Sequence, residues 1–199
     1  MHLVIQGAEI ATGNLKALAK LSGASAIEQI SATAYRLRDA GVSPEIAKRC
    51  ESARLDFAFV PAGRKLADFR LLVMDMDSTL ITIETIDELA DLVGLKREVA
   101  TITEQAMRGE IEYNESLRRR VAVLKGLDES ALRRVYDERV KLSPGAETLL
   151  AAAQQHGIKT LLVSGGFTHV TNWLKPRLGL DYTHSNTLAV ADGKLTSDL

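Results

Sequence analysis

Two hydrophobic patterns follow one another along the chain, and residues 61–65 separate them. In the first part, short alternating segments and two amphipathic segments predict the order βαββαβ. The expected strands cover 3–6, 26–30, 34–37 and 55–60, and the expected helices cover 14–21 and 44–53. Ser43 at the N-cap and Pro44 at the first helical position favour a helix start there. This order predicts a small α+β domain of ferredoxin-like topology over residues 1–62.

From residue 67 onward the pattern changes to strand, long helical region, strand. Residues 71–74 form an apolar run that predicts a strand buried on both faces. Apolar residues then recur with helical spacing over 86–93, 98–108, 114–124 and 130–140. Four helices are too many for a simple βαβ crossover, so we expect a separate helical cap at about 86–140. The cap should lie over the carboxyl ends of the sheet strands.

The remaining segments predict further α/β structure. The expected elements are a helix at 146–155, a second buried strand at 158–163, a helix at 168–178, short strands at 182–186 and 188–190, and a hairpin turn at 191–194. Pro176 should bend or shorten its helix. The fold class is therefore α/β, with a Rossmann-like core over residues 67–199 and a helical insertion.

Composition narrows the function classes. The chain has 199 residues, 46% of them hydrophobic, with 25 Lys and Arg against 26 Asp and Glu. This balance gives no mark of a nucleic-acid or acidic-membrane binder, and the basic run 118–120 is read as solvated helix surface. Cys50 is the single cysteine, which excludes an internal disulfide and favours a buried, inert thiol in a reducing compartment. Without a signal-like start or a membrane-spanning run, we expect a cytoplasmic protein.

The strongest candidate chemistry follows the strand at 71–74. Asp75 and Asp77 precede a Ser-Thr turn, and in extended backbone their side chains would point to the same side. Ligands of open α/β sheets bind beyond the carboxyl ends of the strands. Two neighbouring carboxylates repel each other unless a cation lies between them or one of them is protonated, so the pair suggests a hard metal ion such as Mg2+. The alternative is an Asx turn that only caps the next helix.

A second turn, Ser164-Gly165-Gly166, stands between a strand and a helix. Its hydroxyl and unhindered backbone N–H groups at a helix N-terminus suit a phosphate oxygen. Alone it could be an ordinary tight turn. Together with the Asp75/Asp77 pair on another strand of the same sheet, it predicts a site for phosphoryl transfer.

At this point the chain resembles the haloacid dehalogenase (HAD)-like phosphatases and, within them, the phosphoserine phosphatases. The resemblance rests on residues 75–80, 84–88, 106–109, 116–121, 164–167 and 192–196, and it covers roughly 67–198. More loosely, the N-terminal part resembles the amino-acid-binding (ACT-like) domain that precedes the phosphatase in some bacterial members. The resemblance implies hydrolysis of O-phospho-L-serine in serine biosynthesis, and a homodimer is possible.

The resemblance also implies roles for individual residues. Asp75 would be the nucleophile that becomes an aspartyl phosphate, and Asp77 the general acid and base. An Asp75 carboxylate oxygen and the Asp77 main-chain carbonyl would hold Mg2+. Glu84 would face the substrate ammonium and Arg120 its carboxylate. The other substrate-binding residues would be Ser164 and Gly165 at the phosphate, and Met107, Tyr113 and Phe167 in the pocket wall.

Plainer interpretations stay open for several of these residues. Glu84 could interact only with the dipole of the following helix. Arg120 could form a surface ion pair with Glu112 or Glu115. Met107 could be ordinary cap core. The four histidines share no ligand-like spacing and receive no role.

Two features implied by the resemblance have no counterpart in these 199 residues. One is a Lys near the nucleophile, and the other is a Gly-Asp-Gly turn that completes the Mg2+ shell, with a nearby Asn. The core would then be incomplete: a fragment, a truncated gene product, or a chain completed by a partner. Because waters replace a carboxylate geometrically but not electrostatically, we expect little phosphatase activity from these residues alone.

Two other functions remain open. The protein could act on another small phosphomonoester, or it could be a non-catalytic protein that binds amino acids or dimerises through its first 60 residues.

Overall fold

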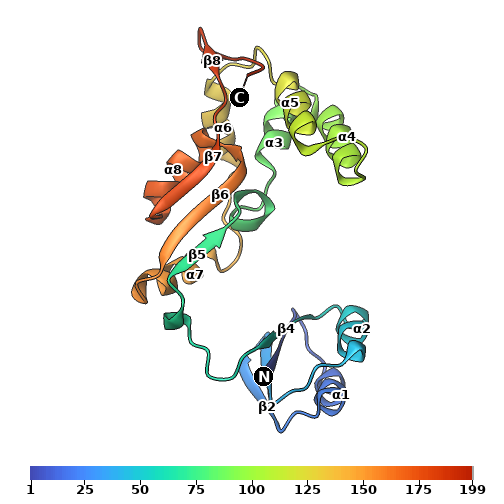
Figure 1. Ribbon diagram of the computed structural model, residues 1–199. Coiled ribbons are helices and arrows are strands. Elements are labelled where there is room, and N and C mark those ends of the chain that lie inside the picture. The colour runs from blue at the N-terminus through green and yellow to red at the C-terminus, as the bar shows by residue number, and fades with distance from the viewer. Residues whose placement is uncertain (199) are drawn as a thin grey trace. The chain divides into compact units, whose positions relative to one another are not determined.

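The computed structural model describes residues 1–198 and divides the chain into two compact units (Figure 1). The first unit is Met1–Asp68 and the second begins at Phe69. A short 3-10 helix, η1 (Leu66–Asp68), ends the first unit. The unit boundary therefore lies a few residues beyond the predicted linker at 61–65.

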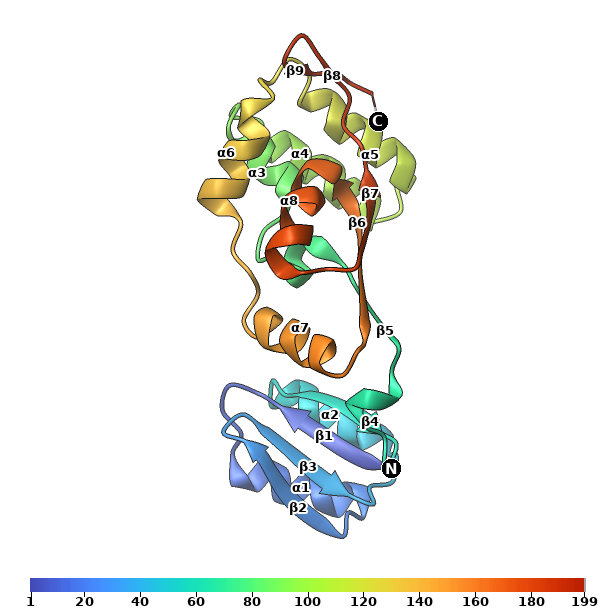
Figure 2. The same ribbon diagram turned by 90° about the vertical axis from the view of Figure 1, so that its left-hand side faces the viewer.

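The first unit has the predicted order of elements. They are β1 (His2–Gln6), α1 (Thr12–Ser22), β2 (Ala26–Ser31), β3 (Ala34–Arg38), α2 (Pro44–Ser52) and β4 (Asp56–Val60). The strands form one antiparallel sheet in the order β2-β3-β1-β4. Figure 2 shows both helices behind this sheet. The ferredoxin-like prediction is confirmed.

The alternating pattern of the strands explains the core of this unit. Leu3 and Leu37 are paired across β1 and β3, and both are fully buried under the helices. Cys50 of α2 lies in the same cluster, and burial raises the pKa of its thiol. The predicted start of α2 is confirmed as well, because the Ser43 hydroxyl accepts a hydrogen bond from the Glu45 N–H at 3.4 Å.

The second unit combines a parallel sheet with a helical insertion. Its elements are β5 (Leu71–Met74), η2 (Met76–Leu80), α3 (Thr85–Asp91), α4 (Lys96–Met107), α5 (Tyr113–Val123), α6 (Ser130–Arg139), α7 (Ala146–Gln155), β6 (Lys159–Phe167), α8 (Thr168–Leu178), β7 (Tyr182–Asn186), β8 (Val190–Ala191) and β9 (Lys194–Leu195). The sheet has the order β5-β6-β7 with parallel pairs. This agrees with the predicted α/β, Rossmann-like fold.

Helices α3 to α6 form the inserted cap and have their own apolar core. Its buried residues include Leu89 of α3, Val99 of α4, Val121 of α5 and Leu132 of α6. Phe167, at the end of strand β6, is buried in the same cluster. The cap core is therefore continuous with the carboxyl end of the sheet.

The hairpin of β8 and β9 packs on the cap. The Gly126 N–H donates to the carbonyl of Leu195, and the Leu195 N–H donates to the carbonyl of Leu127. Leu195 is buried in the cap core. Asp192 and Gly193 form the turn with φ values of 50° and 73°, as expected of a two-residue hairpin loop.

One expectation about this unit is wrong. Strand β5 is covered on one face only: Leu72 and Met74 pack on the core, whereas Leu71 and Val73 are 47% and 54% exposed. The reason is that α7 and α8 contribute to one apolar cluster on the same side of the sheet. Helix α8 has the predicted bounds and continues past Pro176 to Leu178, so the proline does not shorten it, and the expected bend stays a prediction.

Pro176 lies in the last turn of the helix, where its missing N–H removes one backbone hydrogen bond and only two helical residues follow. Across residues 1–198, none of the helices combines the length and the apolar character that crossing a membrane requires.

Ion pairs at Glu88 connect three of the cap helices. The carboxylate of this largely buried residue accepts from Lys96 Nζ at 2.8 Å and from Arg139. Arg139 also bonds to Asp91 at 2.7 Å. The hydrogen bond from Lys96, with a further one from Arg139, lowers the pKa of Glu88 below its ordinary value of 4.5.

We predict that Glu88→Gln lowers the free energy of unfolding by about 1 kcal/mol at pH 7. A depressed pKa stabilises the fold above the ordinary pKa of the group, and this contribution is lost as the pH falls through the lowered value. The difference between the wild type and the variant should therefore shrink as the pH falls below 4.5 and vanish below the lowered pKa of Glu88. Urea unfolding followed by the fluorescence of Trp173, the single tryptophan, measures it.

Glu115→Gln is the matched control, because Glu115 forms an exposed pair with Arg119 on a single helix. This control should change the stability by less than about 0.5 kcal/mol. An equal loss in both variants, or a Glu88→Gln effect that does not depend on pH, would contradict the assignment.

Candidate active site

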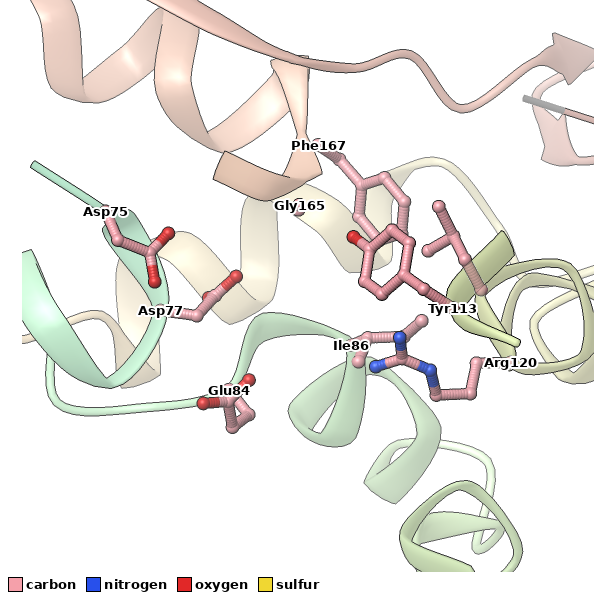
Figure 3. A pocket seen from close by; sticks show the side chains of 10 residues that line it. Asp75, Asp77, Glu84, Ile86, Tyr113, Arg120, Gly165 and Phe167 are labelled. Carbon is pink, nitrogen blue, oxygen red and sulfur yellow. The ribbon is translucent and has the colours of Figure 1, made fainter. Parts of the chain in front are cut away.

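The two aspartates lie where strand β5 ends and an irregular turn begins. Asp75 keeps an extended backbone, and its carboxylate accepts the Met76 N–H at 2.8 Å. Asp77 is extended as well, and Ser78 follows it with a positive φ of 51°. Because Asp75 and Asp77 lie two residues apart in extended backbone, both line the same pocket, whereas Met76 between them is buried (Figure 3).

Asp77 is held from the first residue of α3. Its carboxylate accepts the Thr85 N–H at 3.0 Å and also the Thr85 hydroxyl. Burial raises the pKa of Asp77 to about 6; the hydrogen bonds from Thr85 oppose this shift, and the charges of Glu84 and Asp75 add to it. Sequence reasoning missed Thr85. The sequence feature that could have indicated Thr85 is a hydroxyl residue at the start of a predicted helix, eight positions after Asp77.

A bulge in strand β6 forms the opposite wall. Strand β6 pairs with β7 at Val163 and again at Phe167, so residues 164–166 lie outside the regular ladder. The Ser164 hydroxyl accepts the Gly166 N–H at 2.8 Å and retains its own proton for donation. Asn186 donates to the Gly165 carbonyl at 2.8 Å. Ser164 itself is buried and contacts the pocket wall through Gly166.

The space around Gly166 leaves little room for a side chain. Its φ is not positive, but a methyl group at this position would lie 2.8 Å from Asp77 Oδ2, 2.9 Å from Met76 Cε and 3.0 Å from Ser164 Oγ. The backbone of the turn and the Asp77 carboxylate therefore approach each other closely because no side chain lies between them.

The cap closes the pocket from the other side. The cavity has a volume of about 240 Å3. It is lined by Asp75, Asp77, Glu84, Ile86, Tyr113, Leu117, Arg120, Gly165, Gly166 and Phe167. Three carboxylates thus share the cavity with one guanidinium group. Sequence reasoning missed Ile86 and Leu117, because apolar residues at helical spacing are indistinguishable from cap core.

The surroundings of Glu84 and Arg120 test whether Glu84 only interacts with the helix dipole and whether Arg120 only forms a surface ion pair. Glu84 occupies the N-cap position of α3 without capping it, and its carboxylate accepts the Ser78 hydroxyl at 2.6 Å. Glu115 pairs with Arg119 and not with Arg120. Within residues 1–198, Arg120 forms no salt bridge, and its Nε donates to the carbonyl of Ser116 at 3.4 Å. Both side chains face the cavity (Figure 3).

Met107 is placed differently. It lies at the end of α4 with 85% of its surface exposed, and it does not line the cavity. The predicted contact of Met107 with the substrate stays a prediction.

The comparisons with known proteins agree with this geometry. Residues 69–195 match the family model of haloacid dehalogenase-like hydrolases. The chain belongs to the haloacid dehalogenase-like hydrolase family. Residues 3–49 of this HAD-like hydrolase match a domain of unknown function, DUF4072.

Individual relatives resemble the HAD-like hydrolase in sequence and in structure. A phosphoserine phosphatase of Albidiferax ferrireducens is 58% identical over 139 residues, which are 69% of this chain and 58% of that protein. A HAD family hydrolase from Salmonella enterica serovar Typhi superposes with a TM-score of 0.82 at 31% identity, covering 99% of this chain and 71% of that chain.

A structure described as a phospho-aspartyl intermediate analogue of phosphoserine phosphatase superposes with a TM-score of 0.61 at 42% identity. It covers 65% of this chain and 62% of that chain. This chain spans about half to three-fifths of the length of the curated relatives that it matches. For three of them the matched region is 58%, 56% and 46% of the relative's length.

We predict that Gly166→Ala reduces phosphomonoester hydrolysis at least roughly tenfold, because its methyl group displaces the Asp77 carboxylate or the turn. The rate is measured with p-nitrophenyl phosphate under single-turnover conditions, so that even a slow enzyme gives a ratio to the wild type.

Gly13→Ala is the control, since a methyl group there meets no atom within 4 Å and lies in the first unit. A Gly166→Ala rate within about twofold of the Gly13→Ala rate would show that the close packing around Asp77 is unimportant.

Proposed function

We propose that the protein is a Mg2+-dependent phosphoserine phosphatase, which hydrolyses O-phospho-L-serine to L-serine and phosphate in the last step of serine biosynthesis. One observation carries the proposal: the aspartate pair and the two glycines of the Ser-Gly-Gly turn line one pocket together with the carboxylate of Glu84 and the guanidinium of Arg120. The similarity to curated phosphoserine phosphatases supports it.

The donor atoms at the end of β5 fit Mg2+. An Asp75 carboxylate oxygen and the Asp77 main-chain carbonyl are hard oxygen donors, and Mg2+ commonly takes one or two protein carboxylates and keeps several waters. In the described part of the chain, no group of three or more His, Cys, Asp or Glu side chains is placed so that it could hold a metal ion, so waters or substrate oxygens would fill the remaining positions. When bound, the ion would neutralise charge between the nucleophile and the phosphate.

In the proposed reaction, an Asp75 carboxylate oxygen attacks phosphorus. The bond between phosphorus and the serine oxygen breaks as the bond to Asp75 forms, and Asp77 gives its proton to the departing serine oxygen. Asp77 then takes a proton from water, whose oxygen attacks phosphorus and releases phosphate from Asp75. The hydrogen bonds from Thr85 hold Asp77 in position for both proton transfers.

Recognition of the amino-acid end would come from Glu84 and Arg120. The Glu84 carboxylate would bind the substrate ammonium, and the Arg120 guanidinium would bind the substrate carboxylate. The Ser164 hydroxyl and the Gly165 N–H would bind phosphate oxygens. Because Arg120 has no salt-bridge partner among residues 1–198, its charge is available to a ligand.

The proposal extends to the first unit and to the cellular location. Its ferredoxin-like topology is compatible with an ACT-like domain that binds an amino acid or forms a homodimer, although topology alone does not select a function. A single, buried cysteine is compatible with a cytoplasmic protein.

We predict that Arg120→Ala reduces the second-order rate constant for O-phospho-L-serine roughly 10- to 100-fold, because a charged hydrogen-bond partner is removed. O-phosphoethanolamine lacks the carboxylate, so its rate constant should change by less than about threefold. Both substrates are assayed with Mg2+ under single-turnover conditions. Arg119→Ala, which removes an exposed guanidinium from the same helix, should leave both rate constants near the wild-type values.

Other outcomes separate the alternatives. Equal losses for both substrates would favour a phosphatase for another phosphomonoester. If the wild type turns over neither substrate while L-serine binds to it in calorimetry, the function is non-catalytic amino-acid binding.

A further inference from the structure

We infer that the hydroxyl group of Tyr113 is a hydrogen-bond donor to the phosphate group in the pocket. The inference rests on the proposed function and adds a substrate-binding contact from the cap. Three observations support the inference: the position of the hydroxyl over the turn, the absence of a hydrogen-bond partner for it among the described residues, and the excess of carboxylates in the cavity.

The hydroxyl lies directly over the predicted phosphate turn. Tyr113 is the first residue of cap helix α5, whereas Gly165 lies in the bulge of strand β6. A methyl group on Gly165 would collide with the Tyr113 hydroxyl and would lie 3.6 Å from its Cζ. Figure 3 shows the hydroxyl end of the ring directed toward Gly165 and the side of the pocket that holds Asp77.

This contact gives Gly165 a specific reason to be glycine. Its φ is not positive, so backbone conformation does not demand glycine there. The Tyr113 hydroxyl instead occupies the space that a side chain at this position would take, so a larger residue there would displace the tyrosine ring from the turn. A hydroxyl so near the backbone of the turn is within reach of any anion that the turn binds.

The Tyr113 hydroxyl has no hydrogen-bond partner among the residues that the structure describes, and the side chain is 55% exposed. Its proton is therefore available to a ligand. Three carboxylates line the cavity against one guanidinium, so a phosphate dianion needs donors that are not already used. A phenol supplies a donor without adding charge, and its bond to an anionic oxygen is charge-assisted.

The test uses inorganic phosphate as the probe, because phosphate lacks the ammonium and carboxylate groups that Glu84 and Arg120 would bind. Phosphate affinity is measured by calorimetry in the presence of Mg2+, and by competition with O-phospho-L-serine hydrolysis. Tyr113→Phe keeps the ring and should weaken phosphate binding roughly tenfold. Tyr182→Phe is the matched control: Tyr182 is 54% exposed, lies on β7 outside the cavity, and should leave the affinity unchanged.

A double-variant cycle tests the contact itself. Gly165→Ala should weaken phosphate binding in the wild-type background, because its methyl group meets the hydroxyl. In the Tyr113→Phe background the loss should be smaller, since the nearest ring carbon lies at an ordinary contact distance of 3.6 Å. Equal losses in the two backgrounds would overturn the contact.

The outcomes for the two proposals are distinguishable. A Tyr113→Phe affinity within about twofold of the wild type overturns the inference and leaves the proposed function intact. If phosphate binds and Tyr113→Phe weakens it, but the wild type hydrolyses only phosphomonoesters other than O-phospho-L-serine, the proposed substrate is wrong and the contact stands. Absence of phosphate binding by the wild type overturns the inference, whereas the proposed function is overturned only if the wild type also fails to hydrolyse O-phospho-L-serine.

Discussion

Electrostatic repulsion among three carboxylates constrains the whole site. Asp75, Asp77 and Glu84 line one cavity of about 240 Å3, and a substrate phosphate would bring further negative charge. Binding an anion there would need a cation or protonation of one carboxylate, together with a set of hydrogen-bond donors, because nearby like charges raise each other's pKa values and oppose anion binding. The pKa of Asp77 is raised first by burial, and the charges of Glu84 and Asp75 add a smaller contribution.

The groups that offset the negative charge of the site come from two parts of the fold, the sheet and the cap. The sheet contributes the Ser164–Gly166 bulge, whose tight packing depends on the missing side chains of the glycines. The cap contributes Arg120 and Tyr113 from helix α5. Phe167 is buried in the cap core although it belongs to strand β6, so the two sources are held together by apolar packing. Cap and sheet therefore meet at the cavity.

Much of this arrangement could be predicted from the sequence. Hydrophobic periodicity predicted the helices and strands to within a few residues, and the acidic pair and the glycine turn indicated the pocket. The covered side of β5 could not be predicted, since a short apolar strand has the same pattern whether one face or both are packed. The hydrogen bonds from Thr85 to Asp77 and the contact between Tyr113 and Gly165 could not be predicted either. They depend on a turn and a bulge that bring residues distant in the sequence together.

Identification of the phosphorylated residue tests the account most directly. The protein is mixed with O-phospho-L-serine labelled in its phosphate, quenched with acid within one turnover, digested with pepsin at acid pH and analysed by mass spectrometry. The account predicts a base-labile phosphate on Asp75 in the peptides that contain this residue, and no label in those peptides after Asp75→Asn. Phosphate on another residue, or turnover that continues in Asp75→Asn at the wild-type rate, would contradict it.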